Sequence, residues 1–442
     1  MRKIARPNAA SVDKRGPYQR LGSRAVIAYD RVRFTAGGAP GCMFFVVATV
    51  VLTLVSAYVG LRLLPALALG HAALALAVVV LALPPLLAVG GMLGRLLTRA
   101  AWARRLTWAA SLALGWVSTL VVLTLLRELA LALGALLMPR PDAAALHRLS
   151  ALAVPALAAV ATVFGLLRAL GRPRVVHVRV PLPDLAPDLQ GLTIVQLSDV
   201  HVGATIRRAY VQRVVDRVNA LRPDLVAITG DLVDGTVVQL AEQVAPLAQL
   251  RSRFGTFFVT GNHEYYSGAA AWIAHLRQMG MQVLMNEHVI LRRGSAALLL
   301  AGVPDPTARA FDPAQRSDPR AALQGAPAHV RPRILLAHRP RCAPAAASAG
   351  FDLQLCGHTH GGQFWPWNLV VRFQEPLSIG LDRLNDLWVY TSRGTGFWGP
   401  PQRLGVPSEI TCLHLVRAGS AANVARARGI EQSLTSPVAA GS

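Results

Sequence analysis

Lysine is nearly missing from this sequence, and so is any regular spacing of cysteine. Of the 45 lysine and arginine residues only Lys3 and Lys14 are lysine, so arginine carries the formal net charge of +22. The four cysteines form no C-x-x-C pair, so their spacing indicates neither a disulfide framework nor a thiolate zinc site. No nucleic-acid motif accompanies the basic charge. We therefore favour an anionic membrane surface over nucleic acid as its partner.

Charged residues are also scarce: they make up 15% of the chain, against 53% hydrophobic residues. That balance is too apolar for an average soluble domain. The apolar residues are concentrated in four runs, at 41–60, 69–93, 107–138 and 149–167. A helix needs about 20 apolar residues to cross a bilayer. The alternative, buried helices of a large soluble core, is disfavoured because the runs carry so few charges.

The third run contains one adjacent charged pair, Arg127 and Glu128. The pair either marks the end of a span or lies inside the helical bundle as a mutual ion pair. Both interpretations leave about four transmembrane helices within residues 41–170. The arginines of the connecting segments gather on one side, in the N-terminal arm, the second loop and the segment after the fourth run. By the positive-inside rule, both termini are expected in the cytoplasm.

Three further regions complete the expected organisation. Residues 1–40 are basic and irregular, and we interpret them as a disordered arm. Residues 171–417 alternate short β-rich runs with helical stretches, which predicts an α/β catalytic domain. Within that domain, 304–332 is expected to be a surface loop. Residues 418–442, rich in Ala, Gly and Ser, are expected to be a disordered tail.

Polar side chains follow five of the predicted strands. They belong to the motifs D-V-H, G-D-L-V-D, G-N-H-E, a single His, and G-H-T-H, whose polar residues are Asp199, His201, Asp231, Asp234, Asn262, His263, His338, His358 and His360. Ligands bind at strand ends in open α/β sheets, so these side chains are expected to converge. Carboxylate, imidazole and amide ligands without thiolate suit divalent Mn, Fe or Zn, and their number suits two ions.

The charge of such a centre points to its substrate. Two divalent ions bring four positive charges, while Asp199, Asp231 and one bridging hydroxide remove three. A slightly positive centre fits a phosphate ester, whose transition state gathers negative charge on oxygen.

The ordered set of five motifs resembles the calcineurin-like metallophosphoesterases. The resemblance spans about 190–416, and "GHTHGGQ" with the closing "SRGTGFWGPPQRLGVPSEITCLHL" is similar to the bacterial branch that carries N-terminal membrane segments. One departure is Pro407-Ser408-Glu409, where that branch usually has two prolines before the Glu. The resemblance implies N-terminal transmembrane α-helices followed by a two-sheet αββα sandwich, in a multi-pass protein of the bacterial inner membrane.

The resemblance also implies a role for each motif residue. The first metal would be bound by Asp199, His201 and His360, and the second by Asn262, His338 and His358. Asp231 would bridge the two. His263 would contact the substrate phosphate or protonate the leaving group, with Asp234 as its carboxylate partner. A metal-bridging hydroxide would then attack phosphorus.

We therefore expect a membrane-anchored, dinuclear metal-dependent phosphoesterase of the phosphodiesterase type. Its substrate would be a phosphodiester or diphosphate, with a lipid-linked one as the preferred class. Phe364, Trp365 and Trp398 would either contact acyl chains or pack at the rim of the fold. The alternatives are a membrane-bound sensor or scaffold that keeps its metals without turnover, and a transporter with a regulatory domain, although the spans offer few polar residues. The sequence does not indicate an oligomeric state.

Overall fold

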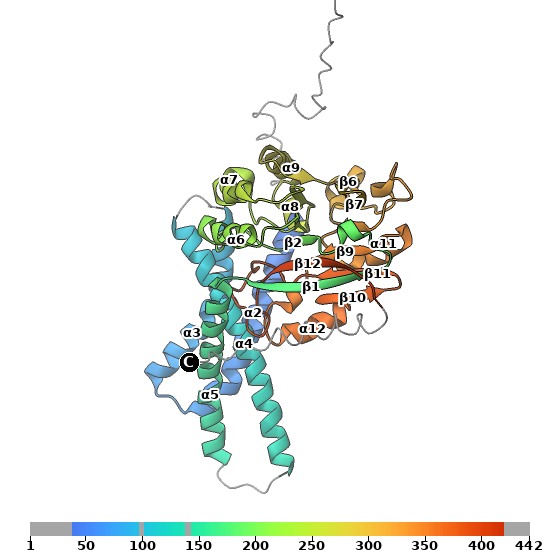
Figure 1. Ribbon diagram of the computed structural model, residues 1–442. Helices are drawn as coiled ribbons and strands as arrows, with labels where there is room; N and C mark the ends of the chain where they lie inside the picture. The colour runs from blue at the N-terminus through green and yellow to red at the C-terminus, as the bar shows by residue number, and fades with distance from the viewer. Residues whose placement is uncertain (1–37, 97–100, 138–142, 420–442) are drawn as a thin grey trace, which may run out of the picture. The chain divides into compact units, whose positions relative to one another are not determined.

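The computed structural model describes residues 38–96, 101–137 and 143–419 (Figure 1). The predicted basic arm and the predicted tail lie almost entirely outside these residues. From Val47 onward the chain forms one compact unit, and all the contacts discussed below lie within it.

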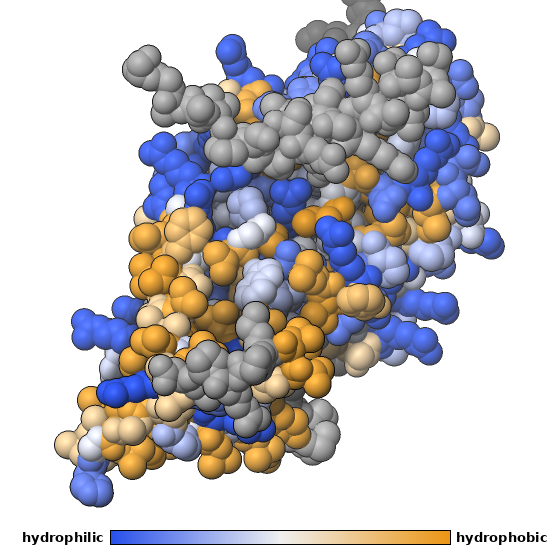
Figure 2. Space-filling model, turned by 90° about the horizontal axis from the view of Figure 1, so that it is seen from below, coloured by the Kyte–Doolittle hydropathy of each residue, from blue (hydrophilic) through white to orange (hydrophobic). Residues whose placement is uncertain are grey.

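Four long helices precede the α/β domain. They are α2 (Gly38–Leu67), α3 (His71–Leu96), α4 (Ala101–Leu137) and α5 (Ala143–Leu170). By length and composition, all four are candidate membrane-spanning helices. Small interior patches hold them together: Val59 of α2, Leu120 of α4 and Ala158 of α5 belong to one buried cluster. Their other faces expose leucine and valine, and hydrophobic residues gather over the helical part of the surface in Figure 2.

The charged pair of the third run does not end its helix. Helix α4 continues past Arg127 and Glu128 to Leu137. The two side chains pair with each other at 2.5 Å, and Arg127 also donates to Ser150 Oγ and the His147 carbonyl of α5. Of the two interpretations, the internal pair is the one that the structure contains. It joins α4 to α5.

Helix α4 is longer than a bilayer requires. Its 37 residues exceed by about 17 the number needed to cross the hydrocarbon core. At Ser118, well inside the helix, its side chain accepts a hydrogen bond of 2.8 Å from Trp367 of the α/β domain. Part of α4 therefore contacts the α/β domain.

The α/β domain contains two six-stranded sheets. The first has the order β1 (Arg174–Leu182), β12 (Glu409–Arg417), β2 (Thr193–Leu197), β3 (Leu225–Ile228), β4 (Thr256–Phe258) and β5 (Gln282–Val283). The second has the order β10 (Gly380–Leu384), β11 (Leu387–Thr391), β9 (Leu353–Cys356), β8 (Arg333–Leu336), β7 (Ala296–Gly302) and β6 (Glu287–Arg293). Strands β2, β3, β4 and β5 are parallel, as are β7, β8, β9 and β11.

Alternating side chains of each strand enter different cores. Leu225 of β3 and Leu355 of β9 meet in a core between the sheets, whereas Val226 of β3 faces the opposite side. That outer face of the first sheet is covered by α6 (Arg208–Ala220), α7 (Val237–Val244) and α9 (Ala269–Gln278). The outer face of the second sheet packs against α11 (Ala343–Ala349). The predicted αββα sandwich is confirmed.

The segment 304–332 differs from its prediction as a plain surface loop. It contains α10 (Ala308–Phe311) and short 3-10 turns. Ala308, Ala322 and Val330 are buried, because the segment folds back and packs on the domain. Another short helix, α12 (Trp367–Gln374), follows the G-H-T-H motif and buries none of its residues. It was not predicted.

Candidate metal centre

The five polar motifs lie beyond the ends of β2, β3, β4, β8 and β9, at one edge of the sandwich. Five of their residues, Asp199, His201, Asp231, His358 and His360, have positive φ angles between 50° and 72°. This left-handed backbone is uncommon for residues other than glycine, and it clusters at functional sites. Gly357 allows the close approach of the motifs, since a Cβ there would collide with Ser198 and Asp199. The backbone thus turns each side chain inward.

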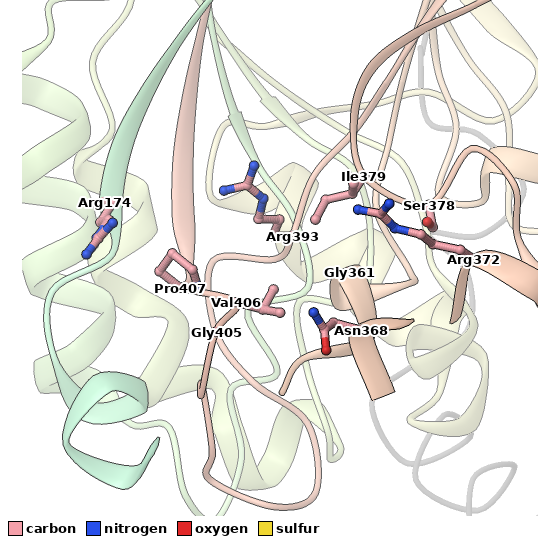
Figure 3. A pocket seen from close by; sticks show the side chains of 10 residues that line it. All are labelled: Arg174, Gly361, Asn368, Arg372, Ser378, Ile379, Arg393, Gly405, Val406 and Pro407. Carbon is pink, nitrogen blue, oxygen red and sulfur yellow. The ribbon is translucent and has the colours of Figure 1, made fainter. Parts of the chain in front are cut away.

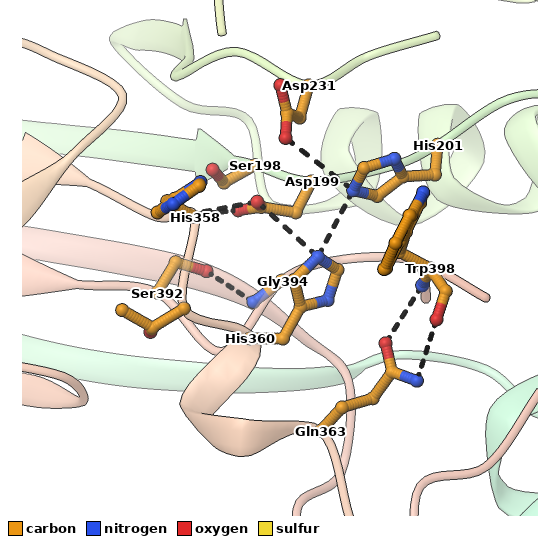
Figure 4. Close-up of polar contacts among 12 residues, drawn as sticks. Ser198, Asp199, His201, Asp231, His358, His360, Gln363, Ser392, Gly394 and Trp398 are labelled. Carbon is orange, nitrogen blue, oxygen red and sulfur yellow. Dashed lines mark hydrogen bonds and ion pairs between the residues drawn. The ribbon is translucent and has the colours of Figure 1, made fainter. Parts of the chain in front are cut away.

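One group of ligand atoms comes from Asp199, His201 and His360. The Nε2 atoms of His201 and His360 lie 3.1 Å apart, and Asp199 Oδ1 is 3.6 Å from His360 Nε2 (Figure 4). Asp199 is fully buried, and its carboxylate also accepts the His358 backbone N–H at 2.9 Å. Three buried ligand atoms thus face one point.

A second group contains Asp231, His338 and His358. His338 Nε2 lies 3.2 Å from His358 Nδ1 and 3.1 Å from Asp231 Oδ2. The other nitrogen of His338 contacts the Thr229 carbonyl at 2.8 Å, which orients the ring. Among the described residues, Asn262 Oδ1 is buried without a hydrogen-bond partner. A buried oxygen without a hydrogen-bond partner, next to His263 in the chain, fits a metal ligand.

Asp231 stands between the two groups. Its Oδ2 atom is 3.1 Å from His338 Nε2 and 3.8 Å from His201 Nε2, so one oxygen faces a histidine of each group. Its other oxygen accepts the His263 backbone N–H at 2.9 Å. The donor set, with imidazole, carboxylate and amide and without thiolate, fits two ions of the Mn, Fe or Zn class.

His263 and Asp234 lie at the open side of the centre. His263 Nδ1 is 2.6 Å from Asp234 Oδ1, and the same oxygen is 3.0 Å from His201 Nδ1. Asp234 therefore orients two imidazoles at once. The His263 ring meets Tyr266 and Trp398 edge to face, at centroid distances of 5.4 and 5.6 Å. The structure brings together all nine polar residues of the five motifs.

The carboxylates make the centre attractive to cations. Burial opposes the charged form of His338, but Asp231 outweighs it and raises the pKa of His338 to about 10. Burial also opposes the charged form of His201, but the carboxylates, Asp234 above all, outweigh it and raise the pKa of His201 to about 9. Burial and the charge of His338 lower the pKa of His358 to about 2. Metal ions compete with protons for such ligands, so binding weakens as the pH falls.

Comparisons with known proteins agree with this geometry. The family model for calcineurin-like phosphoesterases matches residues 192–362. An uncharacterized metallophosphoesterase of Aquifex aeolicus is 32% identical over 231 residues, which cover 52% of this chain and 87% of that relative. The chain belongs to the calcineurin-like phosphoesterase family.

Two vertebrate relatives also carry a membrane part in their names. Each is called "transmembrane protein with metallophosphoesterase domain": the one from Danio rerio is 40% identical over 268 residues, and the one from Bos taurus 43% over 280 residues. The matches cover 59% and 60% of this chain. They span only about three fifths of those relatives, 61% and 63% of their length.

Glu264, the last residue of the G-N-H-E motif, was not assigned a role from the sequence. Its fully buried carboxylate accepts the backbone N–H groups of Gly261 at 2.6 Å, Asp231 at 2.9 Å and Leu232 at 2.8 Å. It thereby fixes two of the phosphoesterase motifs relative to each other. Its place in the motif was the only signal in the sequence.

Arg403 is a second residue that was not predicted, and it is almost completely buried. Its Nη2 atom lies 3.1 Å from His360 Nδ1, and Nη1 donates to the Arg393 carbonyl at 2.7 Å. Its backbone N–H donates to the Gly165 carbonyl of α5 at 3.0 Å. One residue therefore connects a candidate membrane helix with the phosphoesterase centre.

The three aromatic residues predicted as substrate contacts differ from one another in burial. Phe364 is buried and does not reach the surface of the site. Trp365 is half-buried, and its backbone N–H donates to the Leu404 carbonyl at 2.9 Å. Trp398 is 43% exposed and touches the His263 ring. Only Trp398 stands at the opening of the centre.

A cavity of about 320 Å³ lies behind the G-H-T-H-G-G loop, with Gly361 on its wall. Arg174, Arg372 and Arg393 surround it (Figure 3). Arg174 begins the strand after α5, and Arg372 lies on α12. The cavity is basic, which suits an anionic group.

Proposed function

We propose that this phosphoesterase is a membrane-anchored phosphodiesterase with two divalent metal ions, acting on a lipid-linked phosphodiester or diphosphate. The observation that carries the proposal is the convergence of six ligand side chains, Asp199, His201, Asp231, His338, His358 and His360, together with Asn262 Oδ1, which is buried without a protein partner. Without a bound metal ion, this buried oxygen would have no partner and would lower the stability of the fold.

We assign the first ion to Asp199, His201 and His360, and the second to Asn262, His338 and His358. Asp231 would be shared by the two ions, because its Oδ2 atom faces a histidine of each group. Bound there, the ions supply a water nucleophile of lowered pKa and positive charge for the phosphoryl oxygens.

His263 is the proposed general acid. Its Nδ1 atom is held by Asp234, which leaves Nε2 to contact the substrate oxygen or the leaving group. Asp234 also bonds His201, so the acid and one metal ligand share an orienting carboxylate. This non-ligand histidine favours turnover over a sensor or scaffold role.

Exposed apolar side chains of the α/β domain support a lipid-linked substrate. Among the described residues, seven large hydrophobic side chains outside α2–α5 are exposed: Val238, Tyr266, Trp367, Leu369, Val370, Phe373 and Trp398. Four of them lie on α12, which is hydrogen-bonded to α4 through Trp367, and two flank His263. Apolar groups beside a membrane helix and at the site opening suit acyl chains.

The remaining assignments belong to the same proposal. Residues 41–170 anchor the enzyme in a bacterial inner membrane, and 171–417 form the catalytic domain on the cytoplasmic side. The excess of arginine in the segments on that side supports the orientation. A reporter protein that is active only in the cytoplasm is expected to be active when it is fused after residue 417. An inactive reporter would indicate a periplasmic catalytic domain and reverse the proposed orientation.

One assay tests the enzymatic part. Purified protein in detergent with Mn²⁺ is expected to hydrolyse bis-p-nitrophenyl phosphate, and His263→Ala to lower the rate by about 10²–10⁴-fold. Asp231→Asn is expected to abolish turnover and reduce bound metal. His329→Ala and Asp386→Asn, which change exposed residues outside the motifs, serve as matched controls.

The outcomes separate the candidate functions. Equal turnover in wild type, Asp231→Asn and His263→Ala would refute the proposed centre. Two bound metal ions per chain without turnover on any diester would favour the sensor or scaffold. For the lipid class, Trp398→Ser should lower the rate on a phosphodiester in micelles more than on a soluble one. Equal losses on both would exclude acyl-chain contact at Trp398.

A further inference from the structure

A second cluster of metal-ligating side chains lies outside the phosphoesterase centre. Among the described residues, four groups of His, Cys, Asp or Glu place their ligand atoms within 4.8 Å of one another. Three of these groups belong to the centre. The fourth consists of His177, Cys412 and His414.

The cluster arises from the pairing of β1 with β12. His177 is opposite Cys412 in the parallel register, and Cys412 and His414 are two residues apart, so they share one face of the sheet. That face is the outer one, because Cys412 belongs to the core that packs under α6. Strand β1 is at the edge of the sheet, and His177 is exposed while Cys412 is buried.

Two of the three distances between ligand atoms are close to those of tetrahedral coordination, and all three are within 4.8 Å. With typical zinc–ligand bonds, a sulfur and a nitrogen are separated by roughly 3.6 Å and two nitrogens by roughly 3.3 Å. Cys412 Sγ lies 3.6 Å from His414 Nε2, and His177 Nδ1 lies 3.0 Å from the same nitrogen. The histidine pairs of the phosphoesterase centre have similar spacings of 3.1 and 3.2 Å.

We infer that His177, Cys412 and His414 bind one transition-metal ion of the zinc class, separate from the phosphoesterase metals. The thiolate distinguishes this site from the centre and selects zinc-like ions over Mg²⁺ or Mn²⁺. Burial and the nearby His177 lower the pKa of His414, which keeps it in its neutral, ligating form. Burial raises the pKa of the Cys412 thiol to about 11, so binding must release its proton.

The ion would have a structural role. Strand β1 begins at Arg174, directly after α5, and it is held to the sheet by β12 alone. An ion shared by the two strands cross-links the segment that leaves the candidate membrane anchor to the catalytic sheet. Three protein ligands leave the fourth position on the exposed side for water.

Cobalt provides a specific test, because a thiolate ligand gives Co²⁺ a near-ultraviolet charge-transfer band that nitrogen and oxygen ligands do not. Full-length protein stripped with a chelator and titrated with Co²⁺ is expected to show this band. Cys412→Ser and His177→Ala should each remove it. Cys342→Ser changes another buried free cysteine and should leave it intact, as should Asp231→Asn in the phosphoesterase centre.

Metal analysis gives a second measure. Zinc-loaded wild type is expected to hold one ion more per chain than Cys412→Ser or His177→Ala, and His177 is exposed, so its removal should not prevent folding. A hydrogen bond between His177 and His414 alone would survive in Cys412→Ser and would give no cobalt–thiolate band in either protein. Absence of the band in wild type, or its persistence in Cys412→Ser, would overturn the inference.

Discussion

The helices α2–α5 and the α/β sandwich differ in which side chains they expose and in which polar side chains they bury. Most exposed large hydrophobic residues lie on the helices, whereas the sandwich buries carboxylates and imidazoles at its strand ends. The difference follows from the surroundings: apolar side chains are stable in lipid, and buried charges need partners or metals. The exposed face of the helices therefore suits lipid, and the sandwich holds the candidate metal ligands.

The two regions meet at the loop that contains Gln402 and Arg403. Gln402 donates to Thr162 Oγ1 of α5 at 3.0 Å. A Cβ on Gly115 of α4 would approach the Gln402 side chain to 2.9 Å, so a larger residue at 115 would displace the end of that side chain. Because Arg403 also reaches His360, changes at this junction test whether anchor and centre are coupled.

The largest effect on stability is expected from Arg403→Ala. The change leaves the carbonyls of Arg393 and Gly396 without their buried donor, and we expect a loss of about 3–5 kcal/mol in the free energy of unfolding. Activity should fall by about 10–100-fold through His360. Thermal unfolding in detergent and diester hydrolysis measure the two effects. Arg251→Ala, at an exposed position, is the control, and an equal result for both variants would contradict the coupling.

Asp234→Asn should affect the sandwich without disturbing the helices. Burial opposes ionisation of Asp234, but His201 and His263 outweigh it and hold its pKa below the usual 3.8. A lowered folded-state pKa contributes stability that is present above pH 3.8 and lost as the pH falls through the folded value. We expect about 10–100-fold lower kcat, with little change in KM.

The pH dependence gives Asp234→Asn a second readout. The difference in Tm between wild type and variant should be largest near neutral pH and should narrow as the solution is acidified. Asp382→Asn, on the partly exposed strand β10, should show neither effect. A difference in Tm that stays constant with pH would mean that the carboxylate charge of Asp234 does not stabilise the fold.

The contrast between the regions also explains what the sequence could predict. Hydrophobic runs and strand-end motifs are local patterns, so the helices, the α/β class and the convergence of Asp199 with His360 followed from them. The two-sheet sandwich followed from the family resemblance of the motifs. Arg403 and the pairing of His177 with Cys412 depend on contacts between distant segments, for which the sequence has no local signal. The sequence left Phe364 open between acyl-chain contact and packing at the rim of the fold, because burial of a single aromatic depends on distant segments; in the structure it is buried.

The smallest effect is expected from Thr162→Val, which removes one hydrogen bond of the junction and keeps the shape of the side chain. Gln402 Nε2 then loses its partner on α5, and we expect about 1 kcal/mol of destabilisation. Thr124→Val is the matched control, because Thr124 is also buried in a candidate membrane helix but bonds only the Leu120 carbonyl of its own helix. If Thr162→Val lowers diester hydrolysis more than Thr124→Val at equal Tm, the anchor influences the centre through Gln402 and Arg403. Equal activity of the two variants would mean that the helices do not influence the centre through this junction.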